Sequence, residues 1–510
     1  MSDQVKAIFI MIALSLIEFA IIGDEMYVLN AMKSINTSFA ISMSQAQFYI
    51  AVYSISGISA VLVSSYLVEK VGWYIVLMLG LVMFCLSQYS AYMAQNVIYF
   101  TYIARGLAGI AAGFCAPSVI GYGYKYFNKP QLALFLCVLP IALSMSLILA
   151  PLLSGYLITY YHWQIGCLIL FFLFLSLTLL MFVSQIASNT SFKKEARKNK
   201  LNFDIYGAVL FIVSSAIVLF AASNVISWGV FYASDKAAFS LAGYSPIIPL
   251  IILGGFVFLI FLSYEKSREL RHGKYSVLFS KYFMSNSEIK AGLLTSVYMF
   301  FVFAGAKFSL IAYMQESLYK NALDTGKCIS LFAFAMVIAS LFAYWQSQRI
   351  PARFICRIGV WGNIVGAMFI GIGVIGDAIS ICFYLGVISF GAAAGFISSH
   401  TQFVVLSLIQ DEQLQDKAIK LQVIAKKIGT VLGIVVVGSS VTLITNQQDL
   451  QAIQMHMINL PFLQHLSNGV IAIWFAMLSI VTMSVLFLSQ TNKLVDVTLR
   501  DSKAEREAKN

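Results

Sequence analysis

Charged side chains are scarce in this chain. They make up 11% of its 510 residues, whereas hydrophobic residues make up 60% and the mean hydropathy is +0.85. A water-soluble globule of this composition would expose most of its apolar surface to water, so the low charge excludes that class of protein. The composition instead indicates an integral membrane protein.

Disulfide and metal-site patterns are also missing. All seven cysteines lie within or beside apolar segments, and no pair has the spacing of metal ligands. We therefore expect them to be small packing residues. No disulfide, metal or other cofactor is expected.

A nucleotide-driven motor is excluded by a further absence. The phosphate-loop pattern G-x-x-x-x-G-K-[ST] does not occur, and no polar loop is long enough to hold a nucleotide-binding domain. The remaining energy sources are an ion gradient, the membrane potential or the gradient of a solute. We expect no enzymatic activity.

Long apolar runs dominate the chain instead. Each has about 20 residues or more, enough to cross roughly 30 Å of hydrocarbon as a helix, and is too long for a strand of a membrane barrel. An all-α bundle of fourteen transmembrane helices is therefore predicted, with the runs at 7–30, 45–66, 74–94, 97–121, 131–155, 164–187, 204–228, 246–264, 288–314, 326–345, 355–375, 378–399, 423–445 and 467–489.

Basic residues lie mainly on one side of these runs. If the first run starts in the cytoplasm, all but six of the 33 Lys and Arg residues fall in cytoplasmic loops and termini. The six exceptions are Lys33, Lys236, Lys320 and Lys327 on the other side, and Arg105 and Lys307 inside apolar runs. The positive-inside rule therefore predicts that both termini are cytoplasmic. The expected partner of the net charge of +11 is anionic lipid at the cytoplasmic face, and not nucleic acid.

Two basic connectors divide the runs into groups of six, two and six. The predicted domains are an N-terminal six-helix bundle at 1–190, a basic linker with two inserted helices at 191–275, a C-terminal six-helix bundle at 276–490 and a polar cytoplasmic tail at 491–510. Paired bundles around a site at the middle of the membrane are the usual build of secondary transporters.

The loop between the second and third runs carries a first motif. Residues 65–73 read SYLVEKVGW and are similar to the pattern G-x-L-a-D-r-x-G-r, with Glu69 for Asp, Lys70 for Arg and Gly72 retained. This pattern belongs to the major facilitator superfamily.

Two further motifs strengthen this resemblance. Arg105, Gly109 and Gly113 resemble the R-x-x-q-G-x-g-a-a motif of proton-coupled members of the superfamily. The segment APLLSG, with Pro151 and Gly155, is similar to the g-P-x-x-G-G antiporter motif, although Ala and Ser replace two of its glycines. The resemblance implies the superfamily fold of two six-helix bundles, with two inserted helices here, and conformational roles for these motif residues.

The chain also resembles the fourteen-helix drug:proton antiporters. Asp24 lies in a segment similar to l-D-x-T-i-v-N-v-A-l-P-x-I, and the stretches at 162–163 and 204–207 are similar to other segments of that branch. The resemblance covers residues 10–489. It implies export of lipophilic or cationic drugs or metabolites in exchange for protons, by alternating access. We expect the protein to be a monomer and to lie in a bacterial inner membrane. Symport and uniport stay open because the antiporter motif is incomplete.

Five charged residues are expected to lie within the hydrocarbon region: Glu18, Asp24, Glu25, Arg105 and Lys307. Each would cost about 2.5 to 3.5 kcal/mol if it faced lipid, so we expect these side chains to face a cavity or one another. Burial disfavours the charged form of a carboxylate and a nearby cation favours it. The five are therefore the candidate proton-coupling and substrate site. The alternative for each is a structural hydrogen bond or a position at the membrane surface.

Asp24 and Lys307 occupy matching places in the two bundles. Each is the eighteenth residue of its helix if the helices start at residues 7 and 290. A repeat would put them at equal depth, so we expect an ion pair between them that closes the outer side.

Three functions stay open on the sequence. The first is a proton-coupled exporter of lipophilic or cationic compounds, and the second a proton-coupled transporter dedicated to one compound, such as a siderophore or a nutrient. The third is a non-transporting membrane receptor or scaffold. The intramembrane acids favour the first two, because a scaffold has no need to bear their cost.

Overall fold

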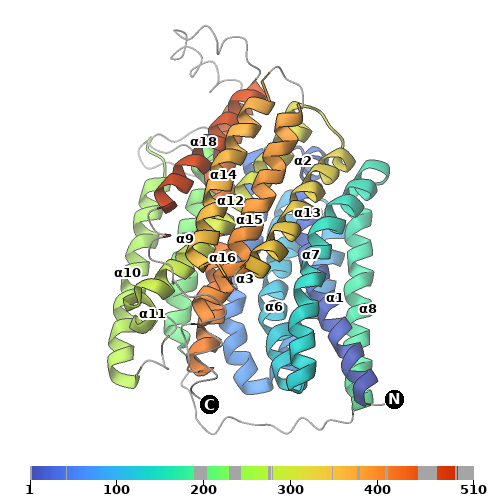
Figure 1. Ribbon diagram of the computed structural model, residues 1–510, viewed down its shortest axis with the longest axis vertical. Helices are drawn as coiled ribbons and strands as arrows, with labels where there is room; N and C mark the ends of the chain where they lie inside the picture. The colour runs from blue at the N-terminus through green and yellow to red at the C-terminus, as the bar shows by residue number, and fades with distance from the viewer. Residues whose placement is uncertain are drawn as a thin grey trace. The chain divides into compact units, whose positions relative to one another are not determined.

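A computed structural model describes the chain over residues 3–41, 43–188, 204–228, 243–273, 277, 280–346, 349–375, 380–407, 412–445, 468–488 and 491. The regular elements in these ranges are helices, which confirms the predicted all-α class (Figure 1). Every predicted apolar run coincides with a helix. Eleven of the described helices are long and apolar enough to cross a membrane, so the count of fourteen crossings stays a prediction.

The chain divides into two compact units. The first contains Met1–Ile212 and Ala322–Lys327, and the second contains Val213–Asn321 and Cys328–Asn510. The predicted limits of the two bundles and of the inserted pair stay predictions.

The first unit is built around α1, which packs against α7 and α8, and around α6, which packs against α3 and α4. Its helices are α1 (Asp3–Asn30), α2 (Met32–Phe39), α3 (Met43–Val71), α4 (Trp73–Tyr92), α5 (Val97–Tyr99), the π-helical turn η1 (Phe100–Arg105), α6 (Gly106–Tyr126), α7 (Lys129–Tyr160), α8 (Trp163–Ser188) and the start of α9 (Ile205–Trp228).

Local sequence sets the breaks between these helices. Gly72 separates α3 from α4 with a φ of 87°, a backbone conformation that side chains with a Cβ rarely adopt. Asn128 begins α7 with a capping box, because its side chain accepts a hydrogen bond from the Gln131 N–H while the Gln131 side chain accepts one from the Asn128 N–H.

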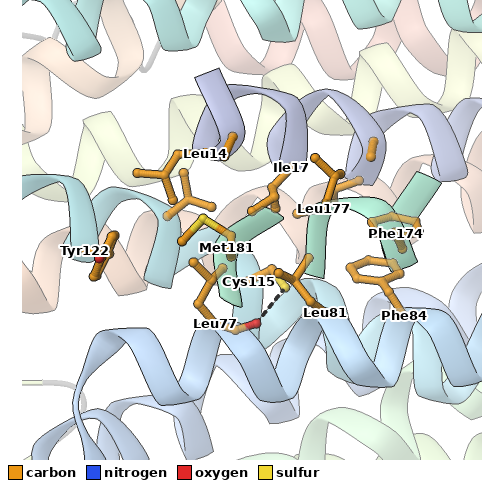
Figure 2. Close-up of a cluster of buried hydrophobic side chains, with 14 of the residues drawn as sticks. Leu14, Ile17, Leu77, Leu81, Phe84, Cys115, Tyr122, Phe174, Leu177 and Met181 are labelled. Carbon is orange, nitrogen blue, oxygen red and sulfur yellow. Dashed lines mark hydrogen bonds between the residues drawn. The ribbon is translucent and has the colours of Figure 1, made fainter. Parts of the chain in front are cut away.

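The core of this unit lies between α1, α4, α6 and α8 (Figure 2). Leu14 of α1 and Leu77 of α4 belong to it, and the rings of Phe84 and Phe174 stack with centroids 4.3 Å apart. Cys115 sits in the same cluster, where its Sγ donates to the Leu77 carbonyl. The cysteines whose side chains are described are free, and all but one of them are buried, which confirms their predicted packing role.

The second unit is built around α12, of which 89% of the most apolar stretch is buried. This helix packs against α15, α16 and α18. The helices of the unit are the rest of α9, α10 (Ile247–His272), α11 (Lys281–Ser285), α12 (Ser287–Ala312), the π-helical turn η2 (Tyr313–Ser317), α13 (Ala322–Gln346) from Cys328 onward, α14 (Ala352–Gly373), α15 (Ile381–Ser407), α16 (Glu412–Thr445) and α18 (Asn468–Leu488).

Candidate functional site

A buried ion pair joins α1 to η1 in the first unit. Nη1 of Arg105 lies 3.1 Å from each carboxylate oxygen of Asp24. Gln88 of α4 donates from Nε2 to Oδ1 of Asp24 at 2.8 Å. Asp24 is 0% exposed and Arg105 4% exposed, so the charges compensate each other away from solvent. A single proton on the carboxylate would remove that compensation, which gives the pair the chemistry of a proton-dependent switch.

A π-helical turn positions Arg105 for this contact. Arg105 is the last residue of η1, and the N–H of Gly106 reaches back five residues to the Thr101 carbonyl. Such a turn shifts the register of the side chains that follow, and π-helical turns occur frequently at functional sites. Ser87 of α4 supports it from the side, where its hydroxyl donates to the Ala104 carbonyl at 2.9 Å.

Two glycines that follow Arg105 in the chain allow α6 to approach α3 closely. A Cβ at Gly109 would collide with the carbonyl oxygen of Tyr53, and one at Gly113 would lie 2.5 Å from the Gly57 carbonyl oxygen. The close contact holds Tyr53 against the ion pair, so that the Arg105 guanidinium lies 4.6 Å from the centre of the Tyr53 ring. The two motif glycines therefore form a helix-packing face.

Tyr53 also links the ion pair to the other two candidate acids. It interacts electrostatically with Glu18, Asp24, Glu25 and Arg105. Glu18 is buried and Glu25 is partly buried. Four of the five predicted site residues therefore lie within electrostatic range of one tyrosine.

Arg105 of the same unit is an ionic partner of Asp24 in the structure. The expected ion pair between Asp24 and Lys307 would join the two units, and it stays a prediction. Counting residues along two helices gives the depth of each side chain, but it does not say which neighbour the side chain faces.

Lys307 lies in α12 of the second unit. It is 2% exposed, and its Nζ lies 3.8 Å from the centre of the Phe303 ring, a cation–π distance. The Lys307 side chain is therefore covered by protein.

Phe303 lies in a mainly apolar cluster within the second unit, which also contains Phe332 and the amide of Asn363. Nδ2 of Asn363 donates to the Tyr298 hydroxyl at 3.0 Å, and that hydroxyl lies 2.7 Å from the Ser484 hydroxyl. We expect this polar network to brace α12, α14 and α18 against one another.

The predicted antiporter motif lies where α7 meets the first turn of α13. A Cβ at Gly155 would lie 2.6 Å from the Ala322 carbonyl oxygen, and a Cβ at Gly326 would collide with the Pro151 carbonyl oxygen. Asn30 of α1 binds to both helices at this contact. Its Nδ2 donates to the Pro151 carbonyl oxygen at 3.1 Å and to the Ala322 carbonyl oxygen at 3.2 Å. The motif residues Pro151 and Gly155 therefore make a tight helix contact.

The predicted loop motif is only partly described. Gly72 provides the break after α3, and Lys70 is exposed in the last turn of that helix. The side chain of Glu69 lies outside the described residues. Trp73 begins α4, and its ring covers Gly121 of α6, where a Cβ would lie 2.5 Å from the ring.

Sequence reasoning missed Gln88 and the π-helical turn. A buried glutamine within the apolar run 74–94 was a usable signal, because a polar side chain at that depth needs a partner. Nothing in the hydropathy of the chain indicates the hydrogen-bond register of η1.

Comparison with known proteins agrees with this architecture. The sequence is similar to the uncharacterized MFS-type transporter YhcA of Bacillus subtilis (strain 168), at 23% identity over 335 residues. That match covers 66% of this chain and 58% of the relative's own length.

Solved structures show the same fold. The POT family transporter PepTSo superposes with a TM-score of 0.66 at 12% identity, covering 96% of this chain and 98% of the other. A D-xylose-proton symporter superposes with a TM-score of 0.59 at 14% identity, with the same coverage of both chains. At these identities the likeness concerns the fold alone.

The family itself is given by sequence. The sequence profile of the Major Facilitator Superfamily matches residues 14–444, which is most of the chain. This match and the apolar helices make the protein an integral multi-pass membrane protein. The chain therefore belongs to the Major Facilitator Superfamily, a family of membrane transporters and not of enzymes.

Proposed function

We propose that this protein is a secondary active transporter that exports lipophilic or cationic compounds in exchange for protons by alternating access. The observation that carries the proposal is the buried ion pair of Asp24 and Arg105, with Gln88 as the third member. Membership of the superfamily supports secondary transport as the general activity.

The ion pair supplies a means of coupling. An unpaired charge in a buried site is costly, so the conformation that holds Asp24 against Arg105 is favoured while Asp24 is ionised. Protonation of Asp24 removes the attraction and leaves Arg105 uncompensated. The protein is then biased toward a second conformation, in which Arg105 contacts another partner or water. A local change of charge shifts the equilibrium between two conformations in this way.

The acids near Tyr53 support a cationic substrate. The carboxylates of Glu18, Asp24 and Glu25 lie within electrostatic range of Tyr53, as does the guanidinium of Arg105. Glu25 is the least buried of the three acids, so it is the one that a cation reaches first. A transporter dedicated to one compound would use the same coupling. Transport assays with a panel of compounds distinguish such a transporter from an exporter of many lipophilic or cationic compounds.

The orientation follows from the basic residues. We propose that both termini are cytoplasmic, in the cytoplasmic membrane of a bacterium. Reporter fusions at residue 198 and at residue 510 should give cytoplasmic signals, and a fusion at residue 235 the opposite; these three positions lie outside the described residues. Any other pattern contradicts this orientation.

Transport into proteoliposomes tests the coupling. The full-length protein is reconstituted, a pH gradient of either direction is imposed, and movement of the lipophilic cation tetraphenylphosphonium is followed. Wild type should move the probe against the proton gradient, and Asp24→Asn should lose the dependence on the gradient.

Asp324→Asn is the matched control. It removes an acid from an exposed pair with Lys327, so it should keep the wild-type gradient dependence. Movement of the probe in the same direction as the protons would indicate symport and would contradict exchange. Unchanged coupling in Asp24→Asn would exclude the ion pair as the coupling element.

A further inference from the structure

We infer that the short helix α2 is a lid over an aromatic layer, and that opening of this lid gives water and protons access to the buried pair of Asp24 and Arg105. The inference rests on the proposed function for the role of Asp24, but the lid is tested without transport. The helix lies at the end of the first unit far from the N-terminus, which is the outer side in the proposed orientation (Figure 1).

The aromatic layer lies about one helical turn from the ion pair, on the side of α2. Each helix with a residue at the level of the pair has an aromatic residue about one turn nearer to α2, which corresponds to about 5 to 7 Å along the helix. The residues, with the one at the level of the ion pair first, are Asp24 and Tyr27 on α1, Tyr53 and Tyr49 on α3, Arg105 and Phe100 on η1, and Cys167 and Trp163 on α8. The layer therefore separates the ion pair from α2.

The rings of this layer pack closely. Phe100 contacts Tyr49 and Trp163 edge to face, with ring centroids 5.4 Å and 5.5 Å apart, and all three side chains are buried. The Tyr27 hydroxyl donates to the Trp163 carbonyl and joins α1 to α8 at the same level. Close packing of this kind excludes the water through which protons move. From this side, Asp24 is therefore closed off.

One face of α2 covers the layer. Asn36 and Phe39 lie three residues apart and so share that face. The Phe39 ring lies 5.8 Å from the Phe100 ring and 5.7 Å from the Trp163 ring, measured between centroids. Oδ1 of Asn36 accepts a hydrogen bond from the Tyr49 hydroxyl at 3.4 Å. Phe39 is only partly buried, so it is the outermost ring of the cluster.

A hydrogen bond holds the end of α2 in place. Nε1 of Trp163 donates to the Ser38 hydroxyl at 3.0 Å. The chain then turns at Ala40 with a φ of 52°, a conformation that residues with a Cβ rarely adopt. Such strain persists only where surrounding contacts hold it. At its other end α2 is set off from α1 by Ala31. The helix is thus a short element between two breaks, held by a few contacts that can be released together.

Modification of Cys167 by a thiol reagent tests the lid. This native cysteine is 1% exposed and interacts electrostatically with Asp24 and Arg105, so it lies behind the aromatic layer as seen from α2. The full-length protein in detergent is treated with 2-(trimethylammonium)ethyl methanethiosulfonate, and peptide mass spectrometry gives the rate at Cys167. Phe39→Ala should raise this rate about 10-fold over wild type, because the lid loses its contacts with two rings.

Phe48→Ala is the matched control for this variant. Phe48 is also partly buried and has an edge-to-face ring contact, with Tyr102 at 5.8 Å, but it does not belong to the layer. Its removal should change the rate at Cys167 by less than about 2-fold.

The hydrogen bond to Trp163 is tested by a second pair of variants. Ser38→Ala should raise the rate at Cys167 about 5-fold, which corresponds to the loss of one ordinary hydrogen bond. Trp163→Phe keeps a ring but loses the same donor, so it should raise the rate by at least as much. Thr37→Ala is the control, because the Thr37 hydroxyl donates only within α2, to the Lys33 carbonyl, and it should leave the rate unchanged.

Equal rates in Phe39→Ala and Phe48→Ala would overturn the inference. An equal rise at Cys115 would also overturn it, because that cysteine lies in the core of the unit and its reaction would indicate that the whole unit loosens. Neither result depends on coupling. If Cys167 reacts faster as expected but Asp24→Asn keeps its coupling, the proposed role of Asp24 fails and the lid stands.

Discussion

Removing the guanidinium of Arg105 tests how strongly the buried pair holds α1 to η1. Arg105→Met leaves the Asp24 carboxylate, which is 0% exposed, with Gln88 as its hydrogen-bond donor. Loss of one member of a buried pair costs about 3 to 5 kcal/mol of folding free energy. Asp24→Asn should cost a similar amount, because it leaves the Arg105 charge uncompensated.

The double variant separates the pair from its two members. Asp24→Asn/Arg105→Met removes both charges, and exchange of a buried pair for neutral groups is often close to neutral. We expect the double variant to be more stable than either single variant, which corresponds to a coupling of several kcal/mol in the double-mutant cycle. The free energy of unfolding is measured in mixed micelles of dodecyl maltoside and sodium dodecyl sulfate.

The exposed pair of Asp324 and Lys327 is the control cycle. Its atoms are 2.9 Å apart, closer than those of the buried pair, but the side chains are 42% and 60% exposed. Its coupling should be only about 0.2 to 0.5 kcal/mol. If the Asp24 and Arg105 changes add within about 0.5 kcal/mol, the two residues act independently and the reasoning fails.

Two further predictions concern close helix contacts. Gly109→Ala should lower the free energy of unfolding by about 1 to 3 kcal/mol, because the new methyl group would collide with the Tyr53 carbonyl oxygen. Gly326→Ala should destabilise this conformation in the same way through the Pro151 carbonyl oxygen. Gly106→Ala is the control for both, since a Cβ there meets nothing within 4 Å and alanine favours a helix. Unfolding in mixed micelles measures all three, and equal stability of the three variants contradicts the packing argument.

The helices were predictable because their cause is local. A run of about 20 apolar residues satisfies its backbone only as a helix in lipid, and each such run became one, as in α1 and α12. The short helix α2 and the π-helical turns were not predicted, because hydropathy carries no information on hydrogen-bond register.

The candidate site was predictable in part. Asp24 and Arg105 were selected as charges too costly to face lipid, and the structure joins them in one ion pair. The same rule put Lys307 in the candidate set, and its expected pair with Asp24 stays a prediction. Gln88 was not predicted, because a neutral amide in an apolar run costs less free energy than a charge and therefore stands out less in the sequence.

The sequence by itself determined the membrane class, the positions of the helices, the expected orientation and the set of charges that require compensation. These follow from the transfer free energies of single residues and from their order along the chain. Tertiary structure alone decided that Arg105 pairs with Asp24, and that Gln88 donates a hydrogen bond to the same carboxylate. That choice depends on the rotation of each helix about its axis, which packing at contacts such as Gly109 against Tyr53 sets.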